Sequence, residues 1–309
     1  MIYTIIRKLL FFILSLYTVA TITFFLMKVI PGDPFVEEQG VPKEILQAIR
    51  HYYGLDFPLY KQYLCYIKGL CLGDLGPSFK YRGCTTCSII RQTFPVSCTL
   101  GGIALAFALM MGILMGGLSA FFQHRWQDRL CGFIGVIGLA TPSFLLAAIV
   151  QYLFAMKWDL FPVALWGEPR QVVLPVMALA AFPMAFIMRL IRSGMAEEMH
   201  KDYIYTAKSK GIHPFRIVWV HLLRNTLLPV ISYLGPLVAS VLTGSFIVEK
   251  IFGIPGLGYW FVSSVIARDY TIIMGLTLFY SAVLMICTFI GDVLHCLLDP
   301  RISMEAQYE

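Results

Sequence analysis

The chain has 309 residues, of which 58% are hydrophobic and 14% are charged, and its mean hydropathy is +0.75. A soluble domain carries about a quarter of charged residues, so this composition excludes a water-soluble fold and predicts an integral membrane protein. The net charge of +6 does not favour nucleic acid as a partner, because the basic residues gather in loops that would face the cytoplasm beside the lipid bilayer.

Six apolar runs are long enough to cross a bilayer, which takes about 20 helical residues. They are residues 9–30, 96–122, 130–156, 172–191, 226–250 and 271–297. Glycines and prolines within them are tolerated in membrane helices. The first run is too long for a signal peptide and no small-residue cleavage site follows it, so we expect a retained helix. The pattern predicts an all-α integral membrane protein with six transmembrane helices.

Residues 31–95 form a long external segment between the first two runs. It contains a predicted helix at 43–53, an apolar and aromatic stretch at 60–70 that lies on the membrane or packs on the bundle, and a turn at 73–77. Cys84 and Cys87 form a C-x-x-C pair in this segment. A local disulfide and no role at all are both open readings, whereas a metal site needs more ligands than this pair offers.

Lysine and arginine residues in the short loops set the predicted orientation. One side carries Arg7, Lys8, Arg125, Arg129, Arg192, Lys201, Lys208, Lys210, Arg216, Arg224 and Arg301, and the other carries only Lys157, Arg170, Lys250 and Arg268. The more basic side is predicted to be cytoplasmic, which places both termini inside.

Residues 191–225 form a charged segment between two apolar runs. A helix is expected to end at Gly211, because glycine accepts the left-handed conformation that terminates helices. A second, short helix is expected to begin at Pro214, which suits a first turn. Its apolar stripe, with amphipathic spacing, is Phe215, Val218, Trp219, Leu222 and Leu223. We expect this stripe to rest on the bundle or the membrane surface, while Lys208, Lys210, His213 and Arg216 face a soluble protein.

The chain contains no P-loop motif, no H-E-x-x-H and no G-x-S-x-G, so no catalytic or metal-binding residue and no cofactor is predicted in it. A charge at the centre of a membrane helix costs about 2.5–3.5 kcal/mol, and ion-coupled carriers accept that cost. Here the ionisable residues lie near the ends of the runs. If the protein moves a solute, the energy is therefore expected to come from a partner.

The cytoplasmic segment reads DYIYTAKSKG from Asp202 to Gly211, and Arg224-Asn225 and Leu228-Pro229 follow it. It resembles the coupling ("EAA") loop of ABC-importer permeases, in the variant of the B-type subunit of the oligopeptide, dipeptide and nickel family. Further blocks that look like this family lie at 31–34, 53–56, 73–76, 252–258, 268–270 and 298–301. Tyr205-Thr206-Ala207 departs from the general loop, which has Glu-Ala-Ala there.

The resemblance implies a type I importer (MetI-like) core of five helices, the second to sixth runs, plus one N-terminal helix. It implies residues 1–93 as N-terminal helix and external segment, 94–298 as permease core and 299–309 as a cytoplasmic tail. The implied partners are a second, homologous permease, two ATPase subunits that bind ATP and Mg²⁺, and an external solute-binding protein. The implied location is the bacterial inner membrane.

The resemblance also assigns roles to residues. The residues expected to couple the permease to the ATPases are Asp202, Thr206, Ala207, Lys208, Lys210, Gly211, Ile212, Pro214, Phe215 and Arg216. Breaks in the helices are candidates for the ligand path or its gates, since they can expose backbone carbonyls. These candidates are Pro142, Ser143, Pro183, Gly235 and Pro236, and a simple packing kink is an equal alternative for the prolines.

The predicted function is a permease subunit that imports oligopeptides or dipeptides. Nickel or another small solute is the alternative substrate for the same machinery. An integral-membrane enzyme would need converging polar groups, for which Asp292 and His295 are the nearest candidates without a third member. A free-standing channel is disfavoured by the large docking segment and the lack of a charged ring.

Overall fold

The structure is a computed structural model that describes residues 2–30, 51, 54–81, 83–243 and 246–298. The block at 31–34, the tail at 299–309 and all of the predicted helix at 43–53 except residue 51 lie outside the described residues. Within the described residues, five helices are long and apolar enough to span a membrane, or six if one bent pair of helices counts as a single span. The expected all-α membrane architecture is therefore confirmed.

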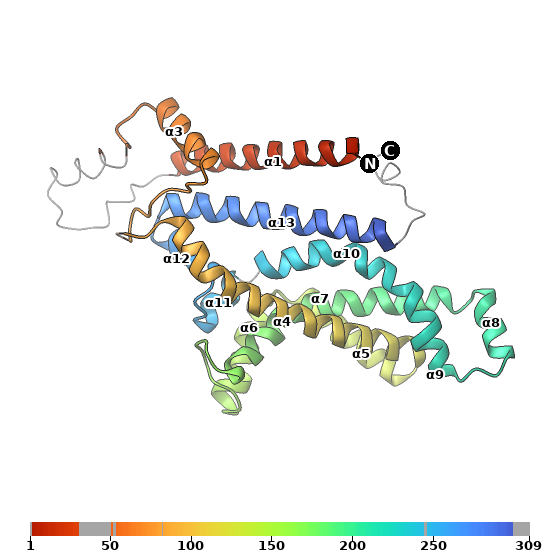
Figure 1. The fold of residues 1–309 in the computed structure, drawn as a ribbon. Coiled ribbons are helices and arrows are strands. Elements are labelled where there is room, and N and C mark those ends of the chain that lie inside the picture. The colour runs from red at the N-terminus through yellow and green to blue at the C-terminus, as the bar shows by residue number, and fades with distance from the viewer. Residues whose placement is uncertain (1, 31–50, 52–53, 82, 244–245, 299–309) are drawn as a thin grey trace.

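The long helices are α1 (Ile2–Val29), α4 (Thr86–Phe121), α7 (Pro169–Glu198), α10 (Leu223–Thr243) and α13 (Tyr270–Leu298), and they form the body of the molecule (Figure 1). Helix α4 begins well before the predicted residue 96, because Thr85 and Ser88 form a capping box at its first turn. The division of the chain at residues 93 and 299 stays a prediction.

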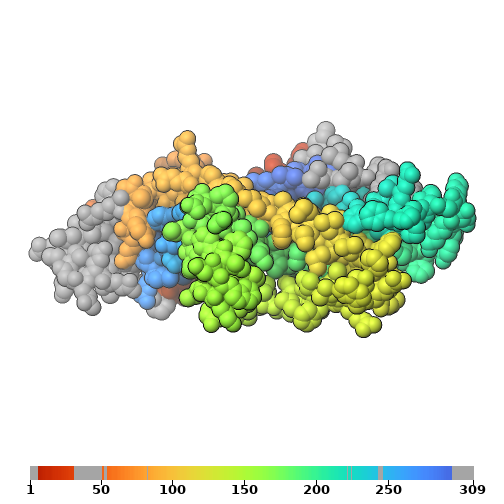
Figure 2. Space-filling view, turned by 90° about the horizontal axis from the view of Figure 1, so that it is seen from below, coloured from red at the N-terminus to blue at the C-terminus, as the bar shows by residue number. Residues whose placement is uncertain are grey.

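The third predicted span, 130–156, is not one straight helix. Helix α5 (Trp126–Ala140) is followed by α6 (Ser143–Val150) and the π-helical η1 (Gln151–Lys157), and the two parts meet at 112°. Proline disfavours helical backbone in the residue before it, and Thr141 before Pro142 is extended with ψ 123°. The segment after this bend, drawn in green in Figure 2, projects from the face of the molecule seen in that view.

Shorter elements lie at the two ends of the bundle. The start of α1, the end of α13, α8 (Asp202–Ser209) and α9 (Pro214–Arg216) share one end, and α3 (Leu59–Cys71) and α12 (Leu257–Ile266) share the other (Figure 1). Helix α3 matches the aromatic stretch predicted at 60–70, and its Tyr66 stacks on Phe24 of α1 with ring centroids 5.5 Å apart. This segment therefore packs on the bundle.

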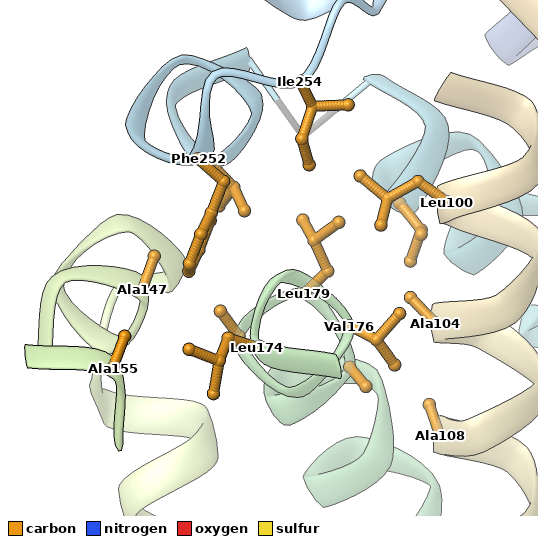
Figure 3. Packing of buried hydrophobic residues seen from close by; sticks show 14 residues of the cluster. Leu100, Ala104, Ala108, Ala147, Ala155, Leu174, Val176, Leu179, Phe252 and Ile254 are labelled. Atoms are coloured by element: carbon orange, nitrogen blue, oxygen red, sulfur yellow. The ribbon is translucent and has the colours of Figure 1, made fainter. Parts of the chain in front are cut away.

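The core forms where α4 and α7 cross. Leu100, Ala104 and Ala108 of α4 face Val176 and Leu179 of α7, and Leu174 of α7 points to the other side, toward Ala147, Ala155 and Phe252 (Figure 3). The small residues of α4 continue toward its end as Gly112 and Gly116, where an added Cβ would lie 2.9 and 2.8 Å from the Cβ atoms of Ile187 and Ile191. Small residues at this spacing let two membrane helices approach closely.

Two buried carboxylates hold the end of the bundle that contains α12. Glu249, on α11 (Phe246–Phe252), accepts hydrogen bonds from Ser97 Oγ at 2.7 Å and from the backbone N–H of Gly258 at 2.7 Å. Asp269 accepts from Ser78 Oγ at 2.5 Å and from Phe79 N–H at 3.1 Å. Both carboxylates are fully buried, so their hydrogen bonds offset the cost of removing them from water.

Candidate functional site

The segment between α7 and α10 contains a break that the sequence did not reveal. Helix α7 ends at Glu198, and α8 begins at Asp202 after the turn through Met199. The sequence predicted a helix that ends at Gly211 but did not place its start, which the structure puts at Asp202. The turn allows α8 to lie across the end of the bundle rather than extend α7 away from it (Figure 1).

Helix α8 is seated by its apolar face. Ile204 is fully buried and Ala207 is 7% exposed, and both belong to a cluster with Ile191 and Met195 of α7. Tyr205, in contrast, is 53% exposed. One face of α8 therefore packs on the bundle, and the opposite face is exposed and available for contact with another protein.

The end of α8 confirms the expected glycine terminus. Gly211 has φ +72°, its N–H donates to Lys208 O at 3.0 Å, and the N–H of Ile212 donates to Ala207 O at 3.2 Å. This pair of bonds is a Schellman motif, which satisfies the last helical carbonyls and favours glycine. No atom lies within 4 Å of an added Cβ at Gly211, so only the backbone conformation requires glycine here.

Helix α9 begins at Pro214 as predicted, but it is not a separate short helix. It continues through the π-helical η2 (Ile217–Leu222) directly into α10, so helical structure runs from Pro214 to Thr243. Within the predicted stripe, Val218 and Leu222 are buried in the core while Phe215 is 53% exposed. The stripe thus packs on the bundle, and the loop ends in a rigid extension of a membrane span.

One carboxylate links three helices at this site, and the sequence did not predict this link. The hydroxyl of Tyr203 in α8 donates to Glu198 at 2.5 Å, and the side-chain amide of Asn225 in α10 donates to Glu198 at 3.3 Å and to the Tyr203 oxygen at 3.2 Å. Lys201 also pairs with Glu198. Polar residues at helix ends were the available signal, but their spacing does not show that they meet.

The charges around Glu198 set the protonation of its partners. Partial burial and the hydrogen bond to Glu198 raise the pKa of the Tyr203 hydroxyl, and the hydrogen bond to Glu198 raises the pKa of the Lys201 ammonium. Tyr203 therefore remains a protonated donor, and Lys201 a cation, throughout the neutral range.

A second polar anchor lies beside the site. Arg192 of α7 binds Asp128 of α5 through two parallel hydrogen bonds of 2.7 and 2.9 Å, and Ser119 of α4 donates to the same carboxylate at 2.5 Å. Asp128 is 6% exposed. This bidentate geometry is the stronger kind of ion pair, and it fixes the ends of three helices next to α8.

The predicted coupling residues divide into two groups. Ala207 is buried and Ile212 is half-buried against the cluster that seats α8. The exposed ones are Asp202, Thr206, Lys208, Lys210, Gly211, Pro214, Phe215 and Arg216. With exposed Tyr205 and His213, they form an exposed surface with three cations, one carboxylate and the rings of Tyr205 and Phe215, which we name the docking surface after its predicted role.

The predicted path residues are not brought together as one surface. Pro142 is exposed at the bend between α5 and α6, and Pro236 is exposed on α10. Pro183 is buried within α7. Gly235 is buried where α10 meets α13, since an added Cβ there would lie 2.6 Å from Cys287 O. Pro183 and Gly235 therefore act in helix packing in this structure.

The external cysteines are unbonded in the structure. Cys84 and Cys87 carry free thiols, and the Cys87 thiol donates to Gly73 O at 3.4 Å. Within the ranges that the structure describes, no three His, Cys, Asp or Glu side chains gather to hold a metal ion.

The chain matches the family model of the binding-protein-dependent transport system inner membrane component over residues 108–304. A model of the N-terminal part of such membrane components matches residues 1–99. The chain belongs to this family. The first match covers the last part of α4, the later long helices and the whole segment 191–225, so the resemblance seen in the motifs is confirmed.

Curated relatives extend over nearly the whole chain. The dipeptide transport system permease protein of Bacillus subtilis (strain 168) is 46% identical over 290 residues, which is 94% of each chain. The oligopeptide transport system permease protein of Haemophilus influenzae is 40% identical over 291 residues, 93% of this chain and 95% of the relative. These similarities identify the family member as a membrane permease.

A solved structure supports the fold alone. The inward-facing MetNI methionine ABC transporter contains a chain that superposes with a TM-score of 0.58 at 15% identity, covering 68% of this chain and 96% of that one. This match confirms the MetI-like fold expected from the sequence. The part of this chain that the match does not cover is long enough to include the additional helix α1.

Proposed function

We propose that this family member is the membrane-spanning permease subunit of a bacterial importer of dipeptides or oligopeptides. The curated relatives named for dipeptide and oligopeptide transport support peptides over nickel as the substrate. The permease lies in the inner membrane with both termini in the cytoplasm. It forms the ligand path with a second, homologous permease, and an external binding protein delivers the peptide.

The observation that carries the proposal is the docking surface built by α8, Gly211 and α9. This surface lies at the same end of the bundle as Arg7 and Lys8 at the start of α1 (Figure 1). Basic residues concentrate on the cytoplasmic side of membrane proteins. The surface is therefore accessible to two soluble ATPase subunits, which bind the ATP and Mg²⁺ that this chain has no motif to hold.

The contacts of α8 and α9 suggest how movement reaches the membrane. Helix α8 rests on α7 through Ile204 and Ala207, and its Tyr203 bonds to Glu198 at the end of α7. Helix α9 continues into α10 without a flexible joint. Displacement of this surface when the ATPases close would tilt α7 and α10 together, which shifts the bundle between its two states.

The terminus at Gly211 provides the test. Replacing Gly211 by Pro, whose φ is fixed near −65°, removes the left-handed residue that turns α8 toward α9. Asparagine tolerates that conformation, so Gly211→Asn is the matched control. In vesicles reconstituted with the complete importer, Gly211→Pro is expected to abolish peptide uptake. Its rate of ATP hydrolysis is expected no longer to rise when the peptide-loaded binding protein is added. Normal uptake by Gly211→Pro would refute the coupling role.

A further inference from the structure

Helices α1 and α13 enclose a lateral groove near the end of the bundle that carries the docking surface. Its volume is about 590 Å³, and it lies between residues 7–15 of α1 and 284–292 of α13. Figure 1 shows these two helices running side by side along the edge of the molecule. The function proposed above uses Arg7 and Lys8 only for the orientation, and it does not use the groove.

The walls of the groove are apolar and open to the bilayer. Leu9 and Phe11 on α1 are 60% and 54% exposed, and Leu284 and Ile286 on α13 are 46% and 48% exposed. In the most apolar 18-residue stretch of α1, only 11% of the residues are buried within the protein. This helix is therefore attached at the periphery of the bundle. Hydrocarbon chains are the natural solvent of such walls.

The end of the groove nearest the docking surface is polar and positively charged. Lys8 Nζ lies 2.9 Å from Asp292 Oδ2 across the groove, and the Arg7 guanidinium lies 5.7 Å from the ring centre of Phe11. Two cations and one carboxylate thus line this end. An apolar cleft that ends in two cations at the depth of the lipid headgroups complements an anionic amphiphile, whose phosphate can interact with both.

We infer that this groove binds one anionic phospholipid of the cytoplasmic leaflet. Its acyl chain lies between α1 and α13 along Phe12 and Phe289, and its phosphate lies beside Arg7 and Lys8. The lipid fills the space between the peripheral helix and the core and so holds α1 against α13. This inference rests on the proposed function only for the orientation, which places Arg7 at the cytoplasmic headgroups.

Native mass spectrometry of the complete importer tests the inference. The complex is exchanged into detergent with equal amounts of phosphatidylglycerol and phosphatidylcholine, and the retained lipids are counted. The unmodified complex is expected to retain the anionic lipid preferentially. Because one arginine near a membrane surface contributes about 1 kcal/mol, Arg7→Gln is expected to reduce that preference about fivefold.

Arg125→Gln is the matched control. Arg125 is also exposed and also lies over a phenylalanine, 6.0 Å from the ring centre of Phe122, but it does not line the groove. Its substitution is expected to leave the lipid preference unchanged. Ser15→Phe, which places a ring inside the groove, is expected to remove the retained lipid even though all the charges remain.

Three results would overturn the inference. They are equal retention of both lipids by the unmodified complex, an unchanged preference in Arg7→Gln, and a rise in retained lipid after deletion of residues 299–309, which would show that the tail occupies the groove. Peptide uptake by the same preparation separates the two claims. Normal uptake without a lipid preference defeats only the lipid site, and a lipid preference without peptide uptake defeats only the proposed substrate.

Discussion

The hydroxyl of Tyr203 in α8 donates a 2.5 Å hydrogen bond to Glu198, the last residue of α7. The same carboxylate accepts a bond from Asn225 near the start of α10. Three helices that meet at the docking surface therefore share one acceptor, although the chain separates Glu198 from Asn225 by the whole docking segment. The bond joins α8, on which we propose that a partner docks, to two long helices of the bundle.

Tyr203→Phe is expected to weaken coupling more than it weakens the fold. The substitution removes one hydrogen bond to a charged group at a partly exposed position, which costs about 1 kcal/mol of stability or slightly more. Peptide uptake per ATP hydrolysed should fall severalfold, because α8 can then move without α7. Tyr152→Phe, at an exposed tyrosine of η1 outside the docking surface, is the control and should keep the ratio. Equal ratios for both variants in reconstituted vesicles would contradict the role of the Tyr203–Glu198 bond.

Asp128→Asn is expected to destabilise the end of the bundle beside α8. Asp128 is buried and holds Arg192 by two hydrogen bonds, and loss of bonds to a charged partner costs about 1.5–3 kcal/mol. The partial exposure of Arg192 places the cost toward the lower end. Thermal unfolding in detergent, followed by circular dichroism, measures the effect. Arg189→Gln, an exposed arginine almost one turn earlier on α7, should leave the melting temperature unchanged; an equal loss in both variants would argue against the ion pair.

The parts of the site that the sequence could predict are those set by local chemistry. Glycine at 211 and proline at 214 impose backbone conformations that few other residues accept, so the end of α8 and the start of α9 follow from the residue types. Hydrophobic runs of sufficient length likewise predicted the long helices. These features depend on neighbours in the chain and need no knowledge of the tertiary fold.

The features that the sequence could not predict depend on contacts between distant residues. The break after Glu198 contains no glycine or proline, so the sequence carries no local signal for it. It is stabilised by the burial of Ile204 in the core. The sequence predicted a helix break at Pro142, but it did not predict the 112° bend, because that angle depends on how α6 packs on α7. The buried Glu249 bonds to Ser97 on a different helix, and no spacing in the sequence shows that the two meet.

Gly235→Ala is expected to destabilise the contact between α10 and α13. An added Cβ would lie 2.6 Å from the backbone oxygen of Cys287, and a backbone atom can yield only if the helices separate. Overpacking of this kind typically costs about 1–3 kcal/mol. Gly102→Ala is the control of opposite sign: no atom lies within 4 Å of an added Cβ there, and alanine favours a helix over glycine by about 1 kcal/mol. A higher melting temperature for Gly235→Ala would contradict the close approach.

Ser97→Ala is expected to loosen the attachment of α12 to α4. The Ser97 hydroxyl donates to Glu249 at 2.7 Å and accepts from the N–H of Leu257 at 2.8 Å, so its loss removes a partner from two buried polar groups. Glu249 keeps its bonds from the N–H groups of Gly258 and Tyr259, so the expected cost is about 1–3 kcal/mol for the Leu257 N–H that loses its partner. Thr99→Ala is the control, because the Thr99 hydroxyl is exposed and bonds only to Pro95 O within its own helix. Hydrogen exchange of the amides in α12, measured by mass spectrometry, should become faster in Ser97→Ala and not in Thr99→Ala. Unchanged exchange in Ser97→Ala would show that Glu249 holds the start of α12 without this hydroxyl.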